Sequence, residues 1–341
     1  MSANEYLIDA STRHQIMLQR LSGGSFNKLK PLLEKLQKDI RARLSENPTD
    51  FQMNRLTALM RDIQSLFDAA NSEVSKQLNL DLNEFIQYET DFQYRMLGNA
   101  VTTELTLPAI EQVVAAVTTA KAELISGGVI KRLTISEMVE TLGTKPATIE
   151  NKIRAGIIEG KSVDQMVRDI MRVANQAHKR DVRTIVRTAF NLAGSEARRA
   201  VTNQNIDVIS GEKWVSTLDG RTSFVCQGLD GKTFAVGDGR YPPAHMNCRS
   251  LRIPLVDQRY AVPGIKGKRS ARDESGTVSQ ISGETTYNSW LKKQSAAFQD
   301  EVLGEDRAKL FRGGMNVDKF TDDNGCTLTL AELKSLDSIT L

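Results

Sequence analysis

Two of the three cysteines and one of the three histidines of this 341-residue chain lie close together in the sequence. Cys226, His245 and Cys248 follow the spacing C-x18-H-x2-C. Thiolate sulfur and imidazole nitrogen are preferred zinc ligands, and a structural zinc ion usually has four ligands. Only three are present here, so Asp219 or a water molecule would have to be the fourth. We therefore predict a buried, hydrogen-bonded cluster without a cofactor, with structural zinc and a Cys226–Cys248 disulfide as the alternatives.

The same side chains also allow a catalytic hypothesis. Cys226 could be a thiol nucleophile, His245 its base and Asp219 the acid that orients the base. However, no nucleophile signature surrounds Cys226, and the sequence has no Walker A motif, no dinucleotide-binding fingerprint and no H-E-x-x-H motif. We therefore predict that the protein is not an enzyme. A nuclease or a Cys-dependent effector enzyme is the alternative.

A change in the period of the apolar residues marks the element that carries these side chains. After Asn205 the apolar residues are β-branched or aromatic, and turn residues separate them. Residues 218–221 (L-D-G-R) and 229–232 (L-D-G-K) are typical of tight turns. The sequence therefore predicts a small β-rich module with hairpins near residues 206–256.

Long amphipathic helices precede this module. Apolar residues spaced three or four apart predict helices over 29–44 and 56–78, with Asn47-Pro48 between them. We expect Pro31 to lie in the first turn of the first helix, where its missing N–H costs nothing. The two helices are expected to close on each other as a hairpin, which would be a spacer or a self-association element.

Further helices are predicted up to residue 202. One runs from Ala109 to Ile125 and ends at Gly127-Gly128. Thr134 and Glu137 fit a capping box, in which a hydroxyl and a carboxylate satisfy free N–H groups at the start of a helix. The last helix is predicted from about residue 176 to residue 202.

Positive charge gathers in two places, although the formal net charge is only +3. The helix over about 176–202 is the most basic in the chain, and residues 257–286, rich in Gly, Ser and Lys/Arg, are typical of a flexible basic linker. Clustered cationic side chains bind phosphate without sequence preference. The predicted phosphate contacts are Arg180, Arg183, Arg187, Lys266, Lys268 and Arg269. The alternative is a solvated polar face or a contact with an acidic protein surface.

The composition is that of an ordinary folded protein. Hydrophobic residues make up 40% of the chain and charged residues 26%, which excludes a disordered chain. No stretch approaches the roughly 20 apolar residues of a membrane span, and the N-terminus lacks the pattern of a signal peptide. Three cysteines in a chain of this length do not make a disulfide framework, so we expect the protein to be made in a reducing cytoplasm.

Together these patterns predict an α+β protein with a mostly helical N-terminal half, a small β-rich module and a short helical tail. We predict four regions along the chain: a helical N-terminal region at 1–130, a module of helices followed by the β-rich Cys/His unit at 131–256, the basic flexible linker at 257–286, and the helical tail at 287–341.

A longer motif surrounds the cysteine and histidine residues. Its order is W, D-G-R, C, L-D-G and P-A-H-M-N-C-R, and the chain from residue 214 to residue 254 resembles the phage head-morphogenesis family named after the F protein of phage Mu. The resemblance extends over about 130–341 and is weak over 1–130. The motif residues are Trp214, Asp219, Arg221, Cys226, Asp230, Gly231, Pro243, His245, Cys248 and Arg249.

This resemblance implies a minor head protein of a tailed bacteriophage. Such proteins associate with the portal, and they influence head assembly and the delivery of DNA. The implied location is the virion, in the capsid interior near the portal, and the host cytoplasm during assembly. The implied partners are the portal protein, packaged double-stranded DNA, and scaffold or capsid proteins. A DNA-binding ejection protein is the alternative. Many family members have Cys-Arg-Cys where this chain has Cys248-Arg249-Ser250, which removes one thiolate from the set.

Overall fold

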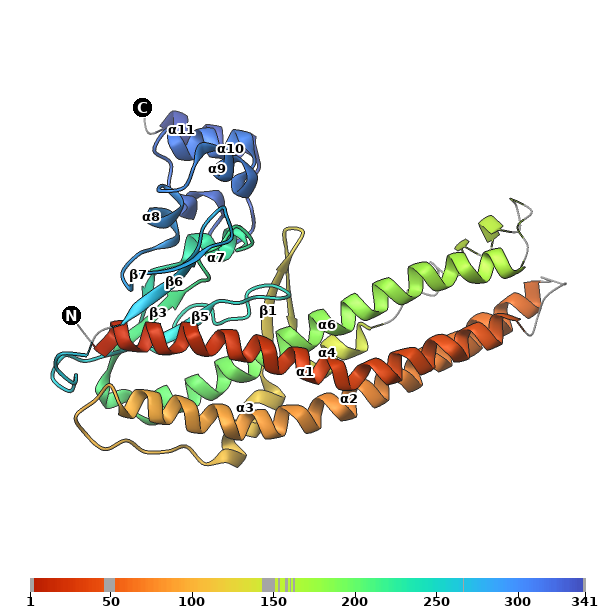
Figure 1. Cartoon of the computed structure of the whole chain (residues 1–341), viewed down its shortest axis with the longest axis horizontal. Helices are drawn as coiled ribbons and strands as arrows, with labels where there is room; N and C mark the ends of the chain where they lie inside the picture. The colour runs from red at the N-terminus through yellow and green to blue at the C-terminus, as the bar shows by residue number, and fades with distance from the viewer. Residues whose placement is uncertain are drawn as a thin grey trace. The chain divides into compact units, whose positions relative to one another are not determined.

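The computed structural model describes the backbone of residues 3–45, 53–142, 151–152, 154–156, 159, 161, 163–265 and 267–339. Helices dominate up to residue 204, small antiparallel sheets follow, and short helices end the described chain (Figure 1). The predicted α+β class is therefore confirmed. None of the described helices combines the length and the apolar character that a membrane crossing requires.

The chain divides into two compact units, each built from non-consecutive segments. We call them the sheet unit (Met1–Gln19, Phe85–Leu133 and Phe190–Leu341) and the helical unit (Arg20–Glu84 and Thr134–Ala189). Three long helices contribute residues to both units: α1 (Ala3–Ser45), α2 (Met53–Gly98) and α6 (Val163–Gln204). The units differ from the four consecutive regions predicted from the sequence, because a change in composition along the chain does not report which segments contact one another.

The helical unit contains the predicted pair of helices. Buried apolar residues of α1 and α2 recur at the predicted spacing: Leu29, Leu33, Leu36 and Ile40, and Leu59, Ile63, Phe67, Val74 and Leu78. Lys28 Nζ lies 2.7 Å from Asp81 Oδ1, and Arg43 pairs with Asp62, so the later residues of one helix meet the earlier residues of the other. The two helices therefore run antiparallel as predicted, while Asn47-Pro48 lies outside the described residues.

Helix α1 begins much earlier than the sequence predicted. It starts at Ala3 and includes Pro31 in its interior rather than in its first turn. The exposed ring of Pro31 lies on the side away from the core, and buried Leu7, Ile8 and Leu18 give the preceding turns their own packing. The lost backbone hydrogen bond at Pro31 is therefore tolerated within a long helix that packs along both of its ends.

The second half of the helical unit carries α4 (Ile135–Glu140) and the first part of α6. The predicted capping box is confirmed, because the Thr134 side chain accepts from the Glu137 backbone N–H and the Glu137 carboxylate accepts from the Thr134 N–H. The predicted helix over about 176–202 is part of α6, which is 42 residues long. Arg183 lies over the ring of Phe26, with its guanidinium carbon 4.6 Å from the ring centroid.

The sheet unit is organised around a three-stranded antiparallel sheet. Strand β3 (Ile209–Val215) is central and pairs with β4 (Thr233–Phe234) on one side and with β5 (Leu251–Val256) on the other. A short 3-10 turn, Ile206–Val208, leads into β3. The predicted turn at residues 229–232 is confirmed, because the Lys232 N–H donates to the Leu229 carbonyl. The predicted β-rich module is thus present, although it also contains the short helix α7 (Phe224–Leu229).

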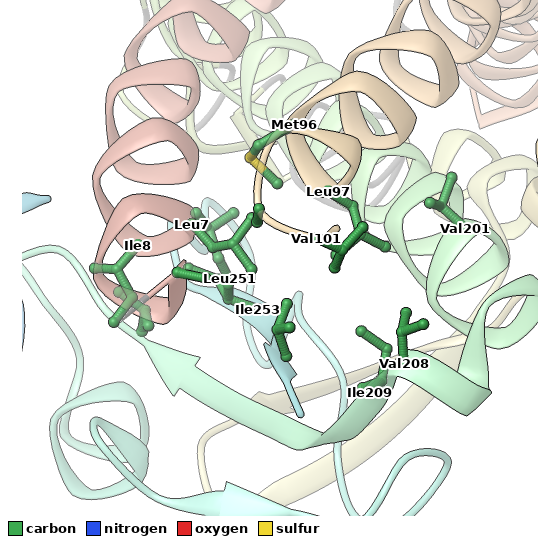
Figure 2. Close-up of a cluster of buried hydrophobic side chains, with 14 residues drawn as sticks. Leu7, Ile8, Met96, Leu97, Val101, Val201, Val208, Ile209, Leu251 and Ile253 are labelled. Carbon is green, nitrogen blue, oxygen red and sulfur yellow. The ribbon is translucent and has the colours of Figure 1, made fainter. Parts of the chain in front are cut away.

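The beginning of α1 and the end of α2 cover the apolar face of this sheet. Figure 2 shows Leu7 of α1 and Leu97 of α2 gathered with Ile253 of β5 in one buried cluster. Asn4 Oδ1 also accepts a hydrogen bond from the backbone N–H of Val256, at 2.8 Å. The first residues of the described chain therefore help to complete the core and the edge of a sheet that is formed from residues 209–256.

A hairpin replaces the end of the helix predicted over 109–125. Helix α3 (Ile110–Thr119) is shorter, and β1 (Ala122–Ser126) pairs with β2 (Val129–Leu133) in an antiparallel register. Gly127 and Gly128 both have positive φ, as a two-residue hairpin turn requires. The glycines therefore mark a hairpin rather than a helix end, and Ala122 and Leu124 alternate as buried residues of a strand.

The segment predicted as a flexible linker, 257–286, contains a second hairpin. Strands β6 (Lys268–Arg272) and β7 (Val278–Ser282) pair in an antiparallel register, and Arg269 and Ala271 of β6 are buried. The Arg272 N–H also donates to the Leu218 carbonyl. The linker prediction is therefore wrong for 268–282, because the buried partners of this polar segment come from distant parts of the chain.

The predicted helical tail is confirmed. It contains α8 (Tyr287–Leu291), α9 (Ala296–Leu303), α10 (Glu305–Arg312), the 3-10 turn Val317–Phe320, and α11 (Leu330–Ile339). Tyr287, Trp290 and Phe320 belong to a buried cluster that also includes Leu218 and Ala271. The tail is thus part of the sheet unit and covers the region next to α7 and β6.

Candidate functional site

The predicted cysteine and histidine residues converge in the sheet unit. Cys226 lies on α7, whereas His245 and Cys248 lie in the loop between β4 and β5. Cys226 Sγ is 3.3 Å from His245 Nε2 and 3.7 Å from Cys248 Sγ, and the three ligand atoms lie within 4.8 Å of one another. We call these three residues the Cys/His cluster. Its assembly brings together residues that the spacing of the motif had singled out.

The orientation of the His245 ring is fixed by its neighbour. His245 Nδ1 lies 2.8 Å from the carbonyl oxygen of Met246. A carbonyl can only accept, so Nδ1 carries the proton and donates, and in the neutral ring Nε2 presents its lone pair to the two sulfur atoms. The imidazole is therefore held in the tautomer that can accept a thiol proton or coordinate a cation.

The surroundings of the cluster are apolar and tightly hydrogen-bonded. Trp214 is fully buried in the same core cluster as Cys226 and Cys248. Its Nε1–H donates to Ser216 Oγ, which in turn donates to the Cys226 carbonyl and lies 3.0 Å from Ser250 Oγ. The motif tryptophan thus contributes apolar packing, and the serine hydroxyls satisfy the polar groups of the buried backbone around the cysteines.

Burial and hydrogen bonding act differently on the two thiols. Burial raises the pKa of Cys226, and its contact with Cys248 adds to this effect. Burial acts in the same direction on Cys248, but the hydrogen bond from Cys226, and the hydrogen bond and positive charge of His245 when its ring is protonated, outweigh it and lower the pKa of Cys248. The cluster is therefore built to carry one negative charge more readily on Cys248 than on Cys226.

Asp219 lies outside the Cys/His cluster. Its carboxylate accepts two hydrogen bonds from Arg249, at 2.6 and 2.7 Å, and one from the Arg221 backbone N–H at 3.0 Å. Burial acts to raise the pKa of Asp219, but the paired guanidinium of Arg249 outweighs burial and lowers this pKa. The predictions of Asp219 as a fourth ligand or as the acid that orients His245 are wrong, because Arg249 occupies both carboxylate oxygens.

Asp230 joins three separate segments of the chain. Its oxygens accept hydrogen bonds from the backbone N–H groups of Ser216 and Tyr287, each at 2.6 Å, and from both terminal nitrogens of Arg269. The adjacent Gly231 has a φ of 86°, and a Cβ there would lie 2.8 Å from Thr286 Cγ2. The D-G step of the motif therefore supplies a buried carboxylate that binds three segments of the chain. The residue after it must be glycine, because its φ is positive and a Cβ would clash with Thr286.

The predicted phosphate contacts differ in their exposure to solvent. Arg180, Arg183 and Arg187 are exposed on α6, and Lys268 is exposed on β6, whereas Lys266 lies outside the described residues. Arg269 is buried, pairs with Asp230 and also donates to the carbonyls of Ser216 and Thr285. The prediction is therefore wrong for Arg269, because a guanidinium in this position cannot reach an external phosphate.

Pro243 and the residues after it are held by a strand that the sequence did not reveal. The peptide bond between Pro242 and Pro243 is cis, and both prolines are buried. The backbone N–H of Ile125, on β1, donates to the carbonyl of Ala244 at 2.9 Å. Ile125 also packs against the core cluster that contains Cys226 and Cys248. The β1–β2 hairpin is therefore part of the support of the Cys/His cluster.

Sequence analysis also did not predict a second network of buried side chains, in which residues of β3 and β5 form an ion pair. Arg252 lies between the rings of Phe234 and Tyr241, with its guanidinium carbon 4.5 and 4.0 Å from their centroids, and pairs with Glu212 at 3.0 Å. Tyr241 donates to Glu212 Oε2 at 2.5 Å. The available signal was a pair of opposite charges in neighbouring parts of the predicted β-rich module, Glu212 in β3 and Arg252 in β5.

An open groove lies next to the Asp219–Arg249 pair. Its volume is about 310 Å³, and its apolar lining includes Ile16 of α1 and Val278 of β7, whose exposed fractions are 50% and 64%. Arg221, Arg249 and Arg272 are the basic lining residues and Asp219 is the acidic one. Three guanidinium groups face one carboxylate, so the groove combines exposed apolar side chains with a net positive rim.

Comparison with known families gives one match. The family model described as Phage Mu protein F like protein matches residues 147–253, which is less than half of the chain and includes Trp214, Cys226, His245 and Cys248. No curated protein and no solved structure matches the chain. The resemblance read from the motif is therefore confirmed over this segment, which is similar to the Phage Mu protein F like family.

Proposed function

We propose, from the Phage Mu protein F-like domain at residues 147–253, that this chain is a portal-associated minor head protein of a tailed bacteriophage. In this proposal the protein is packaged inside the capsid near the portal, and it takes part in head assembly and in DNA delivery. The family match is the observation that carries the proposal. The contacts of the motif residues support it, because these residues bind one another rather than surround a reaction centre.

The absence of an assembled triad is the reason for preferring a structural role over a catalytic one. The Asp219 carboxylate is bound by Arg249, and the His245 Nδ1 proton is donated to a backbone carbonyl. Cys226, the candidate nucleophile, is only 1% exposed. His245 can accept the proton of this thiol, but no carboxylate orients His245 and the buried thiol has no access to a substrate. We infer that these residues maintain the fold of the module.

We propose that the groove beside Asp219 is the surface that contacts the portal. Exposed Ile16 and Val278 offer apolar area, and Arg221 and Arg272 at the rim are exposed. An apolar surface with a basic rim suits a partner segment that carries both apolar and acidic side chains. The docked portion of the portal is therefore expected to be acidic as well as apolar.

Co-purification of the full-length chain with the portal protein of the same phage tests this proposal. Full-length protein is needed because residues 3–19 and 85–133 belong to the same unit as the module. Wild type is expected to be retained by immobilised portal protein, and the double variant Arg221→Glu, Arg272→Glu to be retained much less. Lys319→Glu, a reversal of an exposed charge away from the groove, is the control. Absence of retention for wild type would contradict the portal association, and full retention of the double variant would exclude this groove.

One further observation favours a DNA-binding role as the second candidate. Arg180, Arg183 and Arg187 are all exposed and lie three and four residues apart, so they follow one face of α6. This spacing places three exposed basic residues on one side of the helix, which suits contacts with the phosphates of a double helix. A protein that is packaged beside DNA would use such a face for contacts without sequence preference.

A further inference from the structure

We propose that the Cys/His cluster binds one zinc ion, with Cys226 Sγ, Cys248 Sγ and His245 Nε2 as protein ligands and a water molecule as the fourth ligand. This inference concerns the module itself and does not depend on its partner in the virion. It differs from the metal-free cluster predicted from the sequence, and the reason is geometric: two of the three separations between the donor atoms are close to those in a tetrahedral site, and all three atoms lie within 4.8 Å of one another.

The separations of the donor atoms are the first observation. Zinc at about 2.3 Å from sulfur and about 2.0 Å from nitrogen, in a tetrahedron, places two sulfurs about 3.8 Å apart and a sulfur and a nitrogen about 3.5 Å apart. The Sγ atoms of Cys226 and Cys248 are 3.7 Å apart, and Cys226 Sγ is 3.3 Å from His245 Nε2. Cys248 Sγ and His245 Nε2 are within 4.8 Å, so one zinc ion can be placed between the three atoms by small movements of their side chains.

The orientation of the ligands is the second observation. His245 Nδ1 donates to the Met246 carbonyl, so Nε2 points its lone pair at the sulfurs. A ligating histidine almost always donates its other ring nitrogen in this way, which fixes the ring for the metal. Ser216 Oγ donates to the Cys226 carbonyl and lies 3.0 Å from Ser250 Oγ, so the backbone that carries this ligand is also held in place. The cluster thus has partners that hold its ligands, as well as the ligands themselves.

The fourth position is assigned to water because of what lies around the cluster. Within the described ranges, no other histidine, cysteine or carboxylate side chain joins these three residues. His245 is only partly buried, whereas Cys226 and Cys248 are 1% and 3% exposed, so solvent reaches the ion from the histidine side. Binding displaces one proton from each thiol, leaves neutral His245 unchanged, and releases two protons for each zinc ion bound.

The consequence of such an ion would be structural. Cys226 belongs to α7, and Cys248 directly precedes β5, so one ion would link the helix to the sheet across the loop of residues 235–250. This part of the module has a small apolar core of its own, formed by Trp214, Val225, Ala244 and the two cysteines. A metal link between elements with so small a core contributes directly to folding.

Metal analysis of the full-length chain, purified without chelator and equilibrated with Zn²⁺, tests the proposal. One equivalent of zinc per chain is expected for wild type and for the control Cys326→Ser, which removes the cysteine outside the cluster. Loss of the bound zinc is expected for Cys248→Ser and for His245→Asn. Wild type that binds no zinc, or cluster variants that retain a full equivalent, would overturn the proposal.

Two further measurements test the proposal even if the variants of the cluster do not fold. They are the labelling of cysteine thiols in the wild type and zinc binding by a variant that adds a fourth ligand. In zinc-loaded wild type only Cys326 is expected to react with a thiol reagent, and chelation is expected to release Cys226 and Cys248. Ser250→Cys removes no ligand and adds a thiolate next to Cys226, so zinc should bind with a lower Kd. An unchanged Kd in Ser250→Cys, together with labelling that does not respond to chelator, would contradict a metal at this position.

Discussion

Asp230 and Arg269 lie 39 residues apart in the sequence and form a buried ion pair, with Asp230 Oδ1 2.6 Å from Arg269 Nη2. Asp230 is in the D-G step that follows α7, and Arg269 is on β6. The side chains of both residues are at most 3% exposed. This pair ties the β6–β7 hairpin to the sheet, and the Tyr287 N–H adds the first helix of the tail to the same carboxylate.

Removal of one partner of this pair is expected to destabilise the sheet unit strongly. Arg269→Ala leaves the Asp230 carboxylate buried without its counter-ion, which costs about 3–5 kcal/mol. Lys268→Ala, at the exposed neighbouring position of the same strand, is the matched control and should stay within about 0.5 kcal/mol of wild type. Chemical denaturation followed by tryptophan fluorescence measures both. Equal stability of the two variants would contradict a structural role for the pair.

The helix pair of the helical unit should respond to a cavity at Phe67. This side chain is 2% exposed, so Phe67→Ala removes a packed aromatic ring and should lower the free energy of unfolding by about 3–5 kcal/mol. Leu80→Ala on the same helix, at a position that is 62% exposed, should change it by less than about 0.5 kcal/mol. Thermal unfolding followed by circular dichroism at 222 nm distinguishes the two. Sedimentation of the wild type at several concentrations tests the predicted self-association separately.

Alkaline stability should depend on Tyr241. Burial raises the pKa of Tyr241 to about 12, and its hydrogen bond to Glu212 adds to this effect, while Arg252 acts in the opposite direction. Because the folded pKa lies above the unfolded value of about 10, the neutral phenol contributes stability that is fully present below pH 10. This contribution is lost as the pH rises from about 10 to about 12.

The variant Tyr241→Phe is therefore expected to be less stable than wild type at neutral pH, with a difference that shrinks between pH 10 and pH 12. Equilibrium denaturation at a series of pH values measures this difference. Tyr260→Phe, which alters a tyrosine outside the Glu212 network, is the control. A difference between Tyr241→Phe and wild type that stays constant across this pH range would contradict the assigned hydrogen bond.

The basic face of α6 should determine any binding to DNA. Charge reversal in the double variant Arg183→Glu, Arg187→Glu should weaken binding to duplex DNA at every sequence tested, and it should reduce the steepness of the salt dependence. Fluorescence anisotropy with two unrelated duplexes at several salt concentrations measures both effects. Lys319→Glu, at an exposed position outside the predicted phosphate contacts, is the control. Unchanged binding in the double variant would indicate that this face contacts protein instead.

The helices and the motif could be predicted because their signals are local. Leu33 and Phe67 recur at helical spacing, and Cys226, His245 and Cys248 are brought together as their motif suggested. Arg269 could not be placed in this way, since a segment rich in Gly, Ser and basic residues has the composition of a linker, and the partner that buries it lies 39 residues away. Whether such a segment forms a buried strand depends on contacts with distant residues, which the composition of the segment does not indicate.

Asp219 shows the same limit within the motif. Asp219 precedes Cys226 in the motif, which made it a candidate for the fourth ligand. However, both of its carboxylate oxygens accept hydrogen bonds from Arg249, the residue directly after Cys248. The support of Ala244 by Ile125 is another example, because a hydrogen bond between residues so far apart leaves no local trace. The sequence thus predicted which cysteine and histidine residues come together, but it did not predict which residues bind Asp219 and Ala244.

The contact of Asn4 with Val256 imposes an order on synthesis. The first helical turns of α1 are made early, yet the sheet they cover is completed only when β5 has been translated. Until then Leu7 and Ile8, which are almost fully buried in the folded protein, lack their native partners. The sheet unit therefore cannot be completed until Val256, 252 residues after Asn4, has been translated, and the apolar start of α1 must stay soluble until then.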